Sequence, residues 1–176
     1  MTSDLSEQVQ KAVLTVMDKQ TFKADNLLKV GTPEAWAEAQ TPNGAECFQL
    51  VGESFLDVLV LHLLRKPKYV ELRKSDVGHH KIVQDVLKSD ITINHVLFAA
   101  GAYQNVPPSP WYGMTSELPA AAFKTYLGLY SMEVTKEFKS PTPPENDDDA
   151  ALLTKIELWF NSIFERLADA AVMALP

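Results

Sequence analysis

The interpretation of the fold depends on one stretch of the sequence, Glu46-Cys47-Phe48-Gln49-Leu50-Val51-Gly52-Glu53-Ser54-Phe55-Leu56. Its polar positions 46, 49 and 53 are separated by three and four residues, which places them on one face of a helix. Apolar side chains continue at helical spacing to Leu64, so we expect a helix of about five turns over residues 46–64, with Pro67 ending it. This helix is apolar enough to lie at the centre of the fold.

Helical spacing of apolar residues extends along nearly the whole chain, and no strand pattern is present. It predicts a first helix capped by Ser3 or Ser6, a short segment over 22–30, and helices over 76–88, 92–103, 117–138 and 150–173. Residues 41–44 are predicted to form a turn, and the acidic, proline-rich stretch 140–149 a solvated loop. We therefore expect an all-α fold and a single domain over residues 1–176.

The overall charge does not favour a general nucleic-acid-binding protein. The 176 residues carry a formal net charge of −7, whereas phosphate binding requires lysine and arginine. The basic residues nevertheless cluster after the helix of residues 46–64. This cluster is either a phosphate-facing patch or a solvated basic loop, and it comprises Arg65, Lys66, Lys68, Arg73, Lys74 and Lys81.

Several classes of site are not expected. Cys47 is the only cysteine, so no intramolecular disulfide can form, and its position in an apolar helix predicts a buried, inert thiol. The four histidines show no zinc-binding spacing. The chain begins without a secretory signal pattern, and no run approaches about 20 apolar residues, so we expect no membrane partner. These features predict an intracellular protein and leave the choice between cytoplasm and mitochondrion open.

The stretch from Glu46 resembles the signature helix of the ribonuclease III family, which reads roughly Glu-x-x-Glu-[Phe/Leu]-Leu-Gly-Asp-[Ser/Ala]-x-Leu. Glu46 matches the first Glu, Gln49 stands at the second, and Glu53 replaces the Asp. Residues 88–97 are similar to the family's next block, and residues 120–131 to its second metal block. Gly128 matches in that block, with Ala121 on the Asp and Lys124 on the Glu.

The resemblance covers about residues 26–174 and implies a ribonuclease III-like helical domain. We expect the chain to lack the double-stranded-RNA-binding domain that follows many family members. The altered carboxylates argue against the family's chemistry, because magnesium prefers negatively charged oxygen ligands. The degenerate site comprises Glu46, Gln49, Glu53, Ala121 and Lys124. Lys124 would repel a metal and is expected to pair with Glu53, so we expect no bound metal and no cofactor.

The resemblance thus implies a catalytically inactive module that acts as a dimeric scaffold associated with RNA or a ribonucleoprotein. Family domains pair through the signature helix, which predicts a homodimer interface containing Phe48, Val51 and Phe55. One alternative is a divergent double-stranded-RNA endonuclease that uses Mg²⁺ or Mn²⁺. Its replacement ligands would come from Glu46, Glu53, Asp57 and Glu117. A second alternative, a helical dimerisation protein with no RNA role, fits the acidic composition best.

Overall fold

The computed structural model describes residues 2–17, 41–99 and 148–176 and, between the last two ranges, residues 120, 121, 123–125, 127, 128 and 131. The elements named in this part of the chain are α1 (Thr2–Met17), α3 (Pro42–Leu64), η2 (Pro67–Tyr69), α4 (Val70–Lys74), α5 (Val77–Lys88), α6 (Asp90–Ala99) and α8 (Asp148–Met173). No strand occurs in the described ranges, so the predicted all-α fold is confirmed. The predicted segment 22–30 and residues 140–147 of the predicted loop lie outside them.

The central helix α3 begins one turn earlier than the sequence pattern predicts. Thr41 is its N-cap, and the Thr41 hydroxyl accepts a hydrogen bond from the backbone N–H of Gly44 at 3.1 Å. Pro42 occupies the first helical turn, where a missing N–H leaves no hydrogen bond unmade. The predicted turn over residues 41–44 was therefore wrong, because a threonine–proline pair that is typical of turns is equally suited to starting a helix.

The end of α3 is close to the predicted position, but the chain then forms two short elements that were not predicted. Arg65 caps α3, and Pro67 starts the 3₁₀ helix η2, which leads directly into α4. Elements of three and five residues are too short to show a helical period in the sequence.

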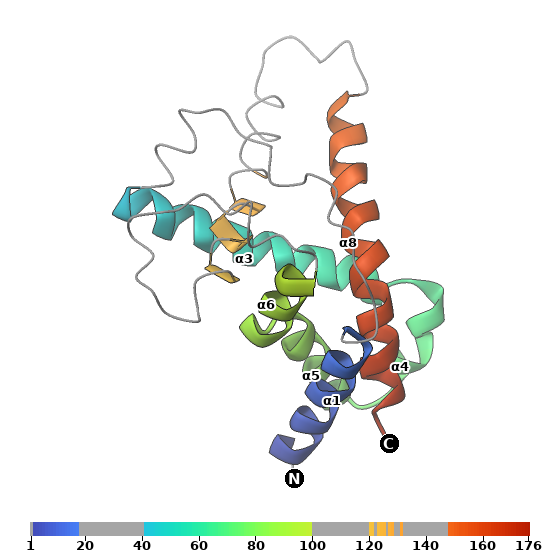
Figure 1. Ribbon diagram of the computed structural model, residues 1–176. Coiled ribbons are helices and arrows are strands. Elements are labelled where there is room, and N and C mark those ends of the chain that lie inside the picture. The colour runs from blue at the N-terminus through green and yellow to red at the C-terminus, as the bar shows by residue number, and fades with distance from the viewer. Residues whose placement is uncertain are drawn as a thin grey trace.

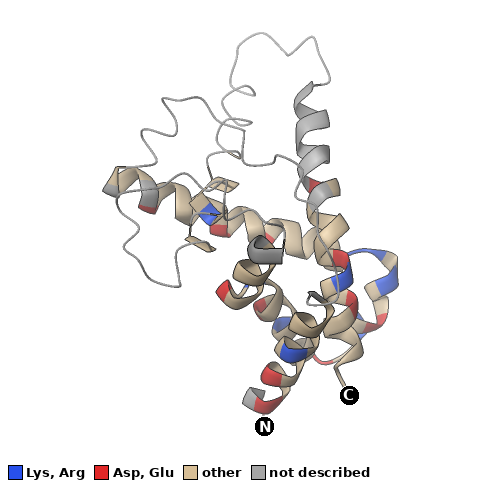
Figure 2. Cartoon of the chain, in the orientation of Figure 1, with Lys and Arg blue, Asp and Glu red and all other residues tan. Residues whose placement is uncertain are grey.

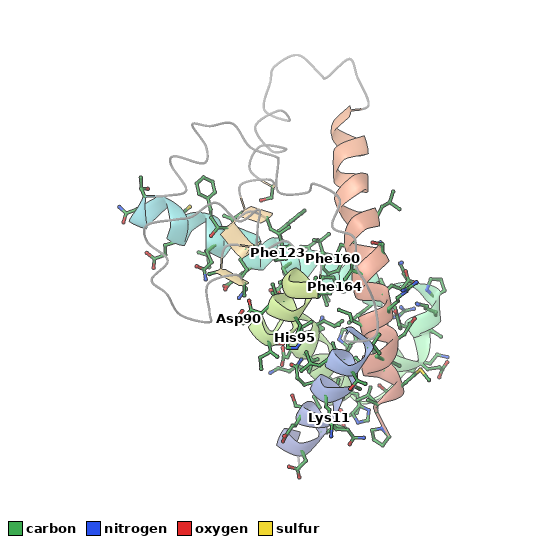
Figure 3. All side chains as sticks on the ribbon, in the orientation of Figure 1. Lys11, Asp90, His95, Phe123, Phe160 and Phe164 are labelled. Atoms are coloured by element: carbon green, nitrogen blue, oxygen red, sulfur yellow. The ribbon has the colours of Figure 1, made fainter. Side chains whose placement is uncertain are left out.

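The core lies where α1, α3, α5, α6 and α8 meet (Figure 1). Val9 and Val13 of α1 are fully buried, as their spacing in the first predicted helix suggests. The rings of Phe160 and Phe164 on α8 stack with their centroids 4.0 Å apart. Phe123 belongs to the same buried cluster, and Figure 3 labels these three rings. Residues 120–131 are thus attached to the helical core through an aromatic side chain.

A buried polar contact joins α1 to the junction between α5 and α6. Gln10 on α1 donates a hydrogen bond to the hydroxyl of Thr92 at 2.9 Å. That hydroxyl donates to the carbonyl oxygen of Val86 at 2.7 Å. The Ser89 hydroxyl accepts from the backbone N–H of Thr92 at 3.2 Å, so Ser89 caps the start of α6. Thr92 is fully buried, and these bonds compensate the desolvation of its hydroxyl.

Residues Glu46–Leu64 of α3 meet the length and composition of a membrane span, contrary to the expectation that no run approaches this limit. The expectation counted uninterrupted apolar residues, whereas a span tolerates a few charged ones. The core helix of a globular fold meets the same criteria, and Leu56, Leu59 and Leu63 of α3 lie in the core. The predicted intracellular location therefore stays a prediction.

Two glycines allow α3 and the 120–131 segment to cross with their backbones in contact. A Cβ atom placed on Gly52 would overlap the carbonyl group of Lys124 and lie 2.9 Å from the backbone nitrogen of Gly128. A Cβ on Gly128 would overlap the carbonyl group of Phe48. Because the obstacle on each side is backbone and not a flexible side chain, any larger residue forces the two segments apart.

We expect Gly128→Ala to destabilise the protein by about 1–3 kcal/mol, the usual cost of overpacking, even though alanine is the better helix former. The measurement is the free energy of unfolding in urea. Gly78→Ala is the matched control, because a Cβ at Gly78 meets only the Asp76 carboxylate at 3.5 Å, an ordinary contact. Equal stability of the two variants would contradict the backbone crossing.

Candidate functional site

Five charged side chains gather where α3 meets the start of α6 and the 120–131 segment. We call this set the carboxylate–lysine cluster, and it comprises Glu53, Asp57, Lys88, Asp90 and Lys124. Glu53 and Asp57 lie one turn apart on α3 and therefore on the same face. Each of these two carboxylates is paired with a lysine from another segment.

Lys124 is the centre of the cluster. Its ammonium lies 3.1 Å from a carboxylate oxygen of Glu53 and 2.7 Å from one of Asp90. The Lys124 side chain is only 12% exposed, whereas those of Glu53 and Asp90 are 44% and 52% exposed. Burial alone would lower the pKa of Lys124, but the hydrogen bonds to Asp90 and Glu53 outweigh it and raise the pKa above its ordinary value. Lys124 is therefore a fixed, nearly buried positive charge.

Local structure explains how these groups meet. Lys88 is the last residue of α5 and reaches Asp57 at 2.6 Å. Asp90 is the first residue of α6, directly after the cap Ser89, and an acidic residue is favoured there by the helix dipole. The contact between Gly52 and the Lys124 backbone brings Lys124 beside Glu53, the residue that follows Gly52. The cluster is thus built from two helix ends and one close crossing.

The sequence analysis predicted the ion pair between Glu53 and Lys124, and the structure contains it. It did not predict Asp90. The available signal was an acidic residue immediately after a capping serine within the block of residues 88–97. Of the other residues assigned to the degenerate site, Glu46 is exposed, Gln49 and Ala121 are half-buried, and neither Glu46 nor Gln49 bonds to a described residue.

The cluster does not fit the divalent metal that active members of the resembled family bind. The ammonium of Lys124 contacts the two carboxylates that a metal would have to share, and like charges repel. Asp57, one of the replacement ligands of the endonuclease alternative, is paired with Lys88. Within the described ranges, no group of three or more His, Cys, Asp or Glu side chains is arranged to hold a metal ion, and Glu117 lies outside these ranges.

The predicted phosphate-facing patch is largely occupied by contacts within the chain. Lys66 and Lys68 pair with Glu165 on α8, and Lys68 also reaches Asp169 at 2.7 Å. Figure 2 shows basic positions of the chain that follows α3 near acidic positions in the C-terminal half of α8. Hydrogen bonds from Lys66 and then Lys68 lower the pKa of Glu165. These lysines anchor the chain after α3 to α8.

Three other residues of the patch differ in how strongly contacts within the chain hold their side chains. Arg73 donates to the carbonyl oxygens of Leu64 and Lys66, both at 3.0 Å, so it closes the end of α3. Lys74 has a solvent-exposed pair with Glu71, which holds it only weakly. Lys81 is exposed and has no partner among the described residues.

The predicted dimer-interface residues do not form the exposed face of α3. Phe48 is only 5% exposed within the single chain, because the 120–131 segment approaches it at Gly128. Phe55 packs partly against the core, and Val51 is half-buried. The predicted burial of Cys47 was wrong, since Cys47 is exposed. Helical periodicity identified apolar stripes on α3 but could not tell which stripe the rest of the chain covers.

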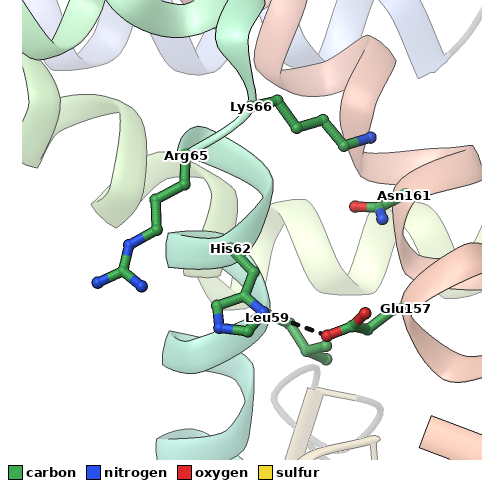
Figure 4. Close-up of a pocket in the computed structure, with 6 residues that line it drawn as sticks. All are labelled: Leu59, His62, Arg65, Lys66, Glu157 and Asn161. Carbon is green, nitrogen blue, oxygen red and sulfur yellow. Dashed lines mark hydrogen bonds and ion pairs between the residues drawn. The ribbon is translucent and has the colours of Figure 1, made fainter. Parts of the chain in front are cut away.

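A pocket of about 410 Å³ lies between the end of α3 and α8 (Figure 4). Its lining residues are Leu59, His62, Arg65, Lys66, Glu157 and Asn161. His62 bonds to Glu157 at 3.2 Å, and Lys66 is engaged by Glu165, whereas the Arg65 side chain points away from Glu157 and Asn161. The polar groups thus tie α3 to α8 and do not converge on one point, unlike a ligand-binding centre.

Comparisons of the chain with protein-family models, with curated proteins and with solved structures found no match.

We expect Lys124→Met to lower the free energy of unfolding by about 1–2 kcal/mol at neutral pH, because two charged hydrogen bonds are lost from partly exposed carboxylates. The folded-state pKa of Lys124 is raised, so its stabilisation is present below the unfolded value of about 10.4 and is lost as pH rises through the folded value. Urea unfolding from pH 7 to 12 measures this difference.

The difference between wild type and Lys124→Met should therefore stay constant to about pH 10 and shrink above it. Lys11→Met, which alters an exposed lysine of α1, is the control and should show a small difference throughout. A Lys124→Met variant as stable as wild type at pH 7 would show that the cluster is not a stabilising contact.

Proposed function

We propose that the chain is a catalytically inactive ribonuclease III-like module that serves as a dimeric scaffold associated with RNA or a ribonucleoprotein. The observation that carries the proposal is the ammonium of Lys124 between Glu53 and Asp90. Lys124 aligns with a metal-binding Glu of the family that the sequence resembles, and Glu53 aligns with a metal-binding Asp. In this chain an internal positive charge stabilises the carboxylates of the cluster.

A lysine at the position of the metal-binding Glu can preserve the local structure without supporting the family's reaction. The Lys124 ammonium offsets the repulsion between two carboxylates, as a bound metal ion would, so the local fold persists. It has no open coordination position, and it can neither bind a phosphate oxygen as a Lewis acid nor generate a metal-bound hydroxide. The module therefore keeps a helical surface and lacks the means to hydrolyse a phosphodiester by two-metal catalysis.

The two alternatives differ in how the structure bears on them. A divergent endonuclease would need to free Glu53 and Asp57 from Lys124 and Lys88, which favours the inactive module. The alternative without an RNA role gains support from the basic patch, because Lys66, Lys68 and Arg73 are engaged inside the chain. RNA association is accordingly the part of the proposal that most needs an experiment.

We expect purified protein to leave long double-stranded RNA intact in both Mg²⁺ and Mn²⁺, because the lysine-filled cluster lacks the ions that would clamp the attacking and leaving oxygens. Gel analysis of a labelled duplex is the measurement. Discrete short products that disappear in Glu53→Ala would overturn the proposal, whereas products that persist in this variant indicate a contaminating nuclease.

Metal affinity provides a second readout of the same prediction that does not depend on activity. The melting temperature of the wild type should not change with millimolar Mn²⁺, whereas Lys124→Glu, with a third carboxylate beside Glu53 and Asp90, should be stabilised by the ion. Lys88→Glu is the matched charge reversal at the edge of the cluster. A wild-type protein stabilised as strongly as Lys124→Glu would show that Lys124 does not replace a metal.

If the module contacts RNA through its basic patch, we expect weak binding that depends steeply on salt. Arg65, Lys74 and Lys81 are the patch residues without a strong partner among the described residues. About three phosphate contacts predict a loss of one to two decades in affinity between about 50 and 200 mM salt. Fluorescence titration of a labelled RNA duplex measures this dependence.

Lys74→Glu combined with Lys81→Glu should remove most of this binding and leave the fold intact, since neither side chain is buried. Lys11→Glu, on α1, is the control for a charge change outside the patch. Arg73 is unsuitable for this test because it closes the end of α3. If no binding occurs even at low salt, the interaction-protein alternative replaces the RNA reading.

A further inference from the structure

The first turn of α3 contains an asparagine that is followed by a glycine. Asn43 and Gly44 come directly after Pro42, the first residue of the helix. The Asn43 side chain is exposed, and no other described residue holds its amide. Glycine has no Cβ to shield its backbone nitrogen, so this nitrogen can approach the amide carbon of the preceding asparagine. The pair thus brings together two groups that can react with each other.

We infer that Asn43 is a site of spontaneous chemical modification, at which its amide is converted to a carboxylate. The backbone nitrogen of Gly44 bonds to Cγ of Asn43, the bond from Cγ to Nδ2 breaks, and ammonia leaves with the proton of the Gly44 N–H. Water then opens the cyclic imide at either of its carbonyl carbons. Opening at Cγ gives aspartate, and opening at the backbone carbonyl carbon gives isoaspartate, in which the main chain runs through the former side chain.

The N-cap of α3 controls when this reaction can occur. Ring closure needs the Gly44 nitrogen in the plane of the Asn43 side chain, which helical backbone angles do not allow. The Gly44 N–H also donates to the Thr41 hydroxyl at 3.1 Å, and this contact is exposed to solvent. The first N–H groups of a helix have no partner within it, and helix ends open easily. The modification therefore proceeds from the opened first turn, and the Thr41 cap limits how often it opens.

The two products differ in their effect on α3. An aspartate at position 43 lies at the positive end of the helix dipole, and repulsion from Glu46, three residues later, offsets this gain. An isoaspartate adds a carbon atom to the main chain between Thr41 and Gly44, so the capping hydrogen bond loses its register. Modification thus leaves one population with an intact start of α3 and another with an opened first turn.

The modification site is independent of the proposed function. Phe48, whose carbonyl group lies against Gly128, comes about one turn after Gly44, so the carboxylate–lysine cluster stays outside the affected turn. Cleavage of RNA by the protein would overturn the inactive-module proposal and leave the modification site unaffected.

Peptide mapping by mass spectrometry of the full-length protein, aged in mildly alkaline buffer, tests the site. Asn43 should be converted at least about tenfold faster than Asn161, which is followed by a serine whose side chain hinders the attack. Asn43→Gln, with an additional methylene before the amide, should show no conversion at this position. An isoaspartyl methyltransferase should label aged wild type far more strongly than this variant. Equal conversion of Asn43 and Asn161 would overturn the inference.

The protective role of the cap is tested with Thr41→Ala. Loss of the hydroxyl should raise the conversion rate of Asn43 by about threefold to tenfold, because the first turn then opens more often. Thr15→Ala is the matched control, since the Thr15 hydroxyl donates to the Lys11 carbonyl oxygen within α1, and it should leave the rate unchanged. Equal rates in the two variants would contradict the role assigned to Thr41.

The structural effect is tested by comparing aged protein with Asn43→Asp, which reproduces only the aspartate product. Asn43→Asp should melt close to the wild-type temperature. The fraction of aged protein that contains isoaspartate, separated by chromatography, should melt about 2–4 °C lower because it has lost the N-cap. Equal melting temperatures of the isoaspartate fraction and Asn43→Asp would show that the first turn tolerates the longer main chain, and would overturn the expected opening.

Discussion

The direct contact between the backbones of α3 and the 120–131 segment is the constraint on which the rest of the site depends. Gly52 and Gly128 remove the Cβ atoms that would keep the two segments apart. The Lys124 carbonyl touches α3 at Gly52, so the Lys124 side chain starts within reach of Glu53. A displacement of about one ångström would lengthen this 3.1 Å contact beyond the range of a hydrogen bond.

Many of the acidic residues in this chain form ion pairs with lysines from other segments. Several lysines that look like free cations in the sequence form ion pairs with carboxylates from distant segments. In the carboxylate–lysine cluster the carboxylates are Glu53, Asp57 and Asp90. On α8 they are Glu165 and Asp169. Several of these pairs join elements that are far apart in the chain. They thus help to fix how α3 lies against its neighbours, although those pairs in which both side chains are exposed contribute little stability individually.

The parts of the fold that could be predicted from sequence are those controlled by residues close together in the chain. Apolar periodicity located α5, α6 and α8 within a few residues, because each has one face in the core. The ion pair between Glu53 and Lys124 could be predicted only because the resemblance aligned two distant segments through Gly128. Asp90 was missed because its role depends on Lys124, which lies in another segment. The exposure of Cys47 was missed because apolar neighbours do not show which side of a helix is covered.

Helix α3 shows why the apolar pattern of the sequence could not identify which helix face is covered within the chain. It is apolar around much of its circumference, and so a binary pattern offers more than one candidate face. The face with Phe48 is covered because the glycine crossing brings the 120–131 segment against it, and the face with Leu50 and Leu61 stays exposed. The same crossing therefore brings a lysine into the carboxylate site and determines which apolar side chains of α3 are covered within the chain.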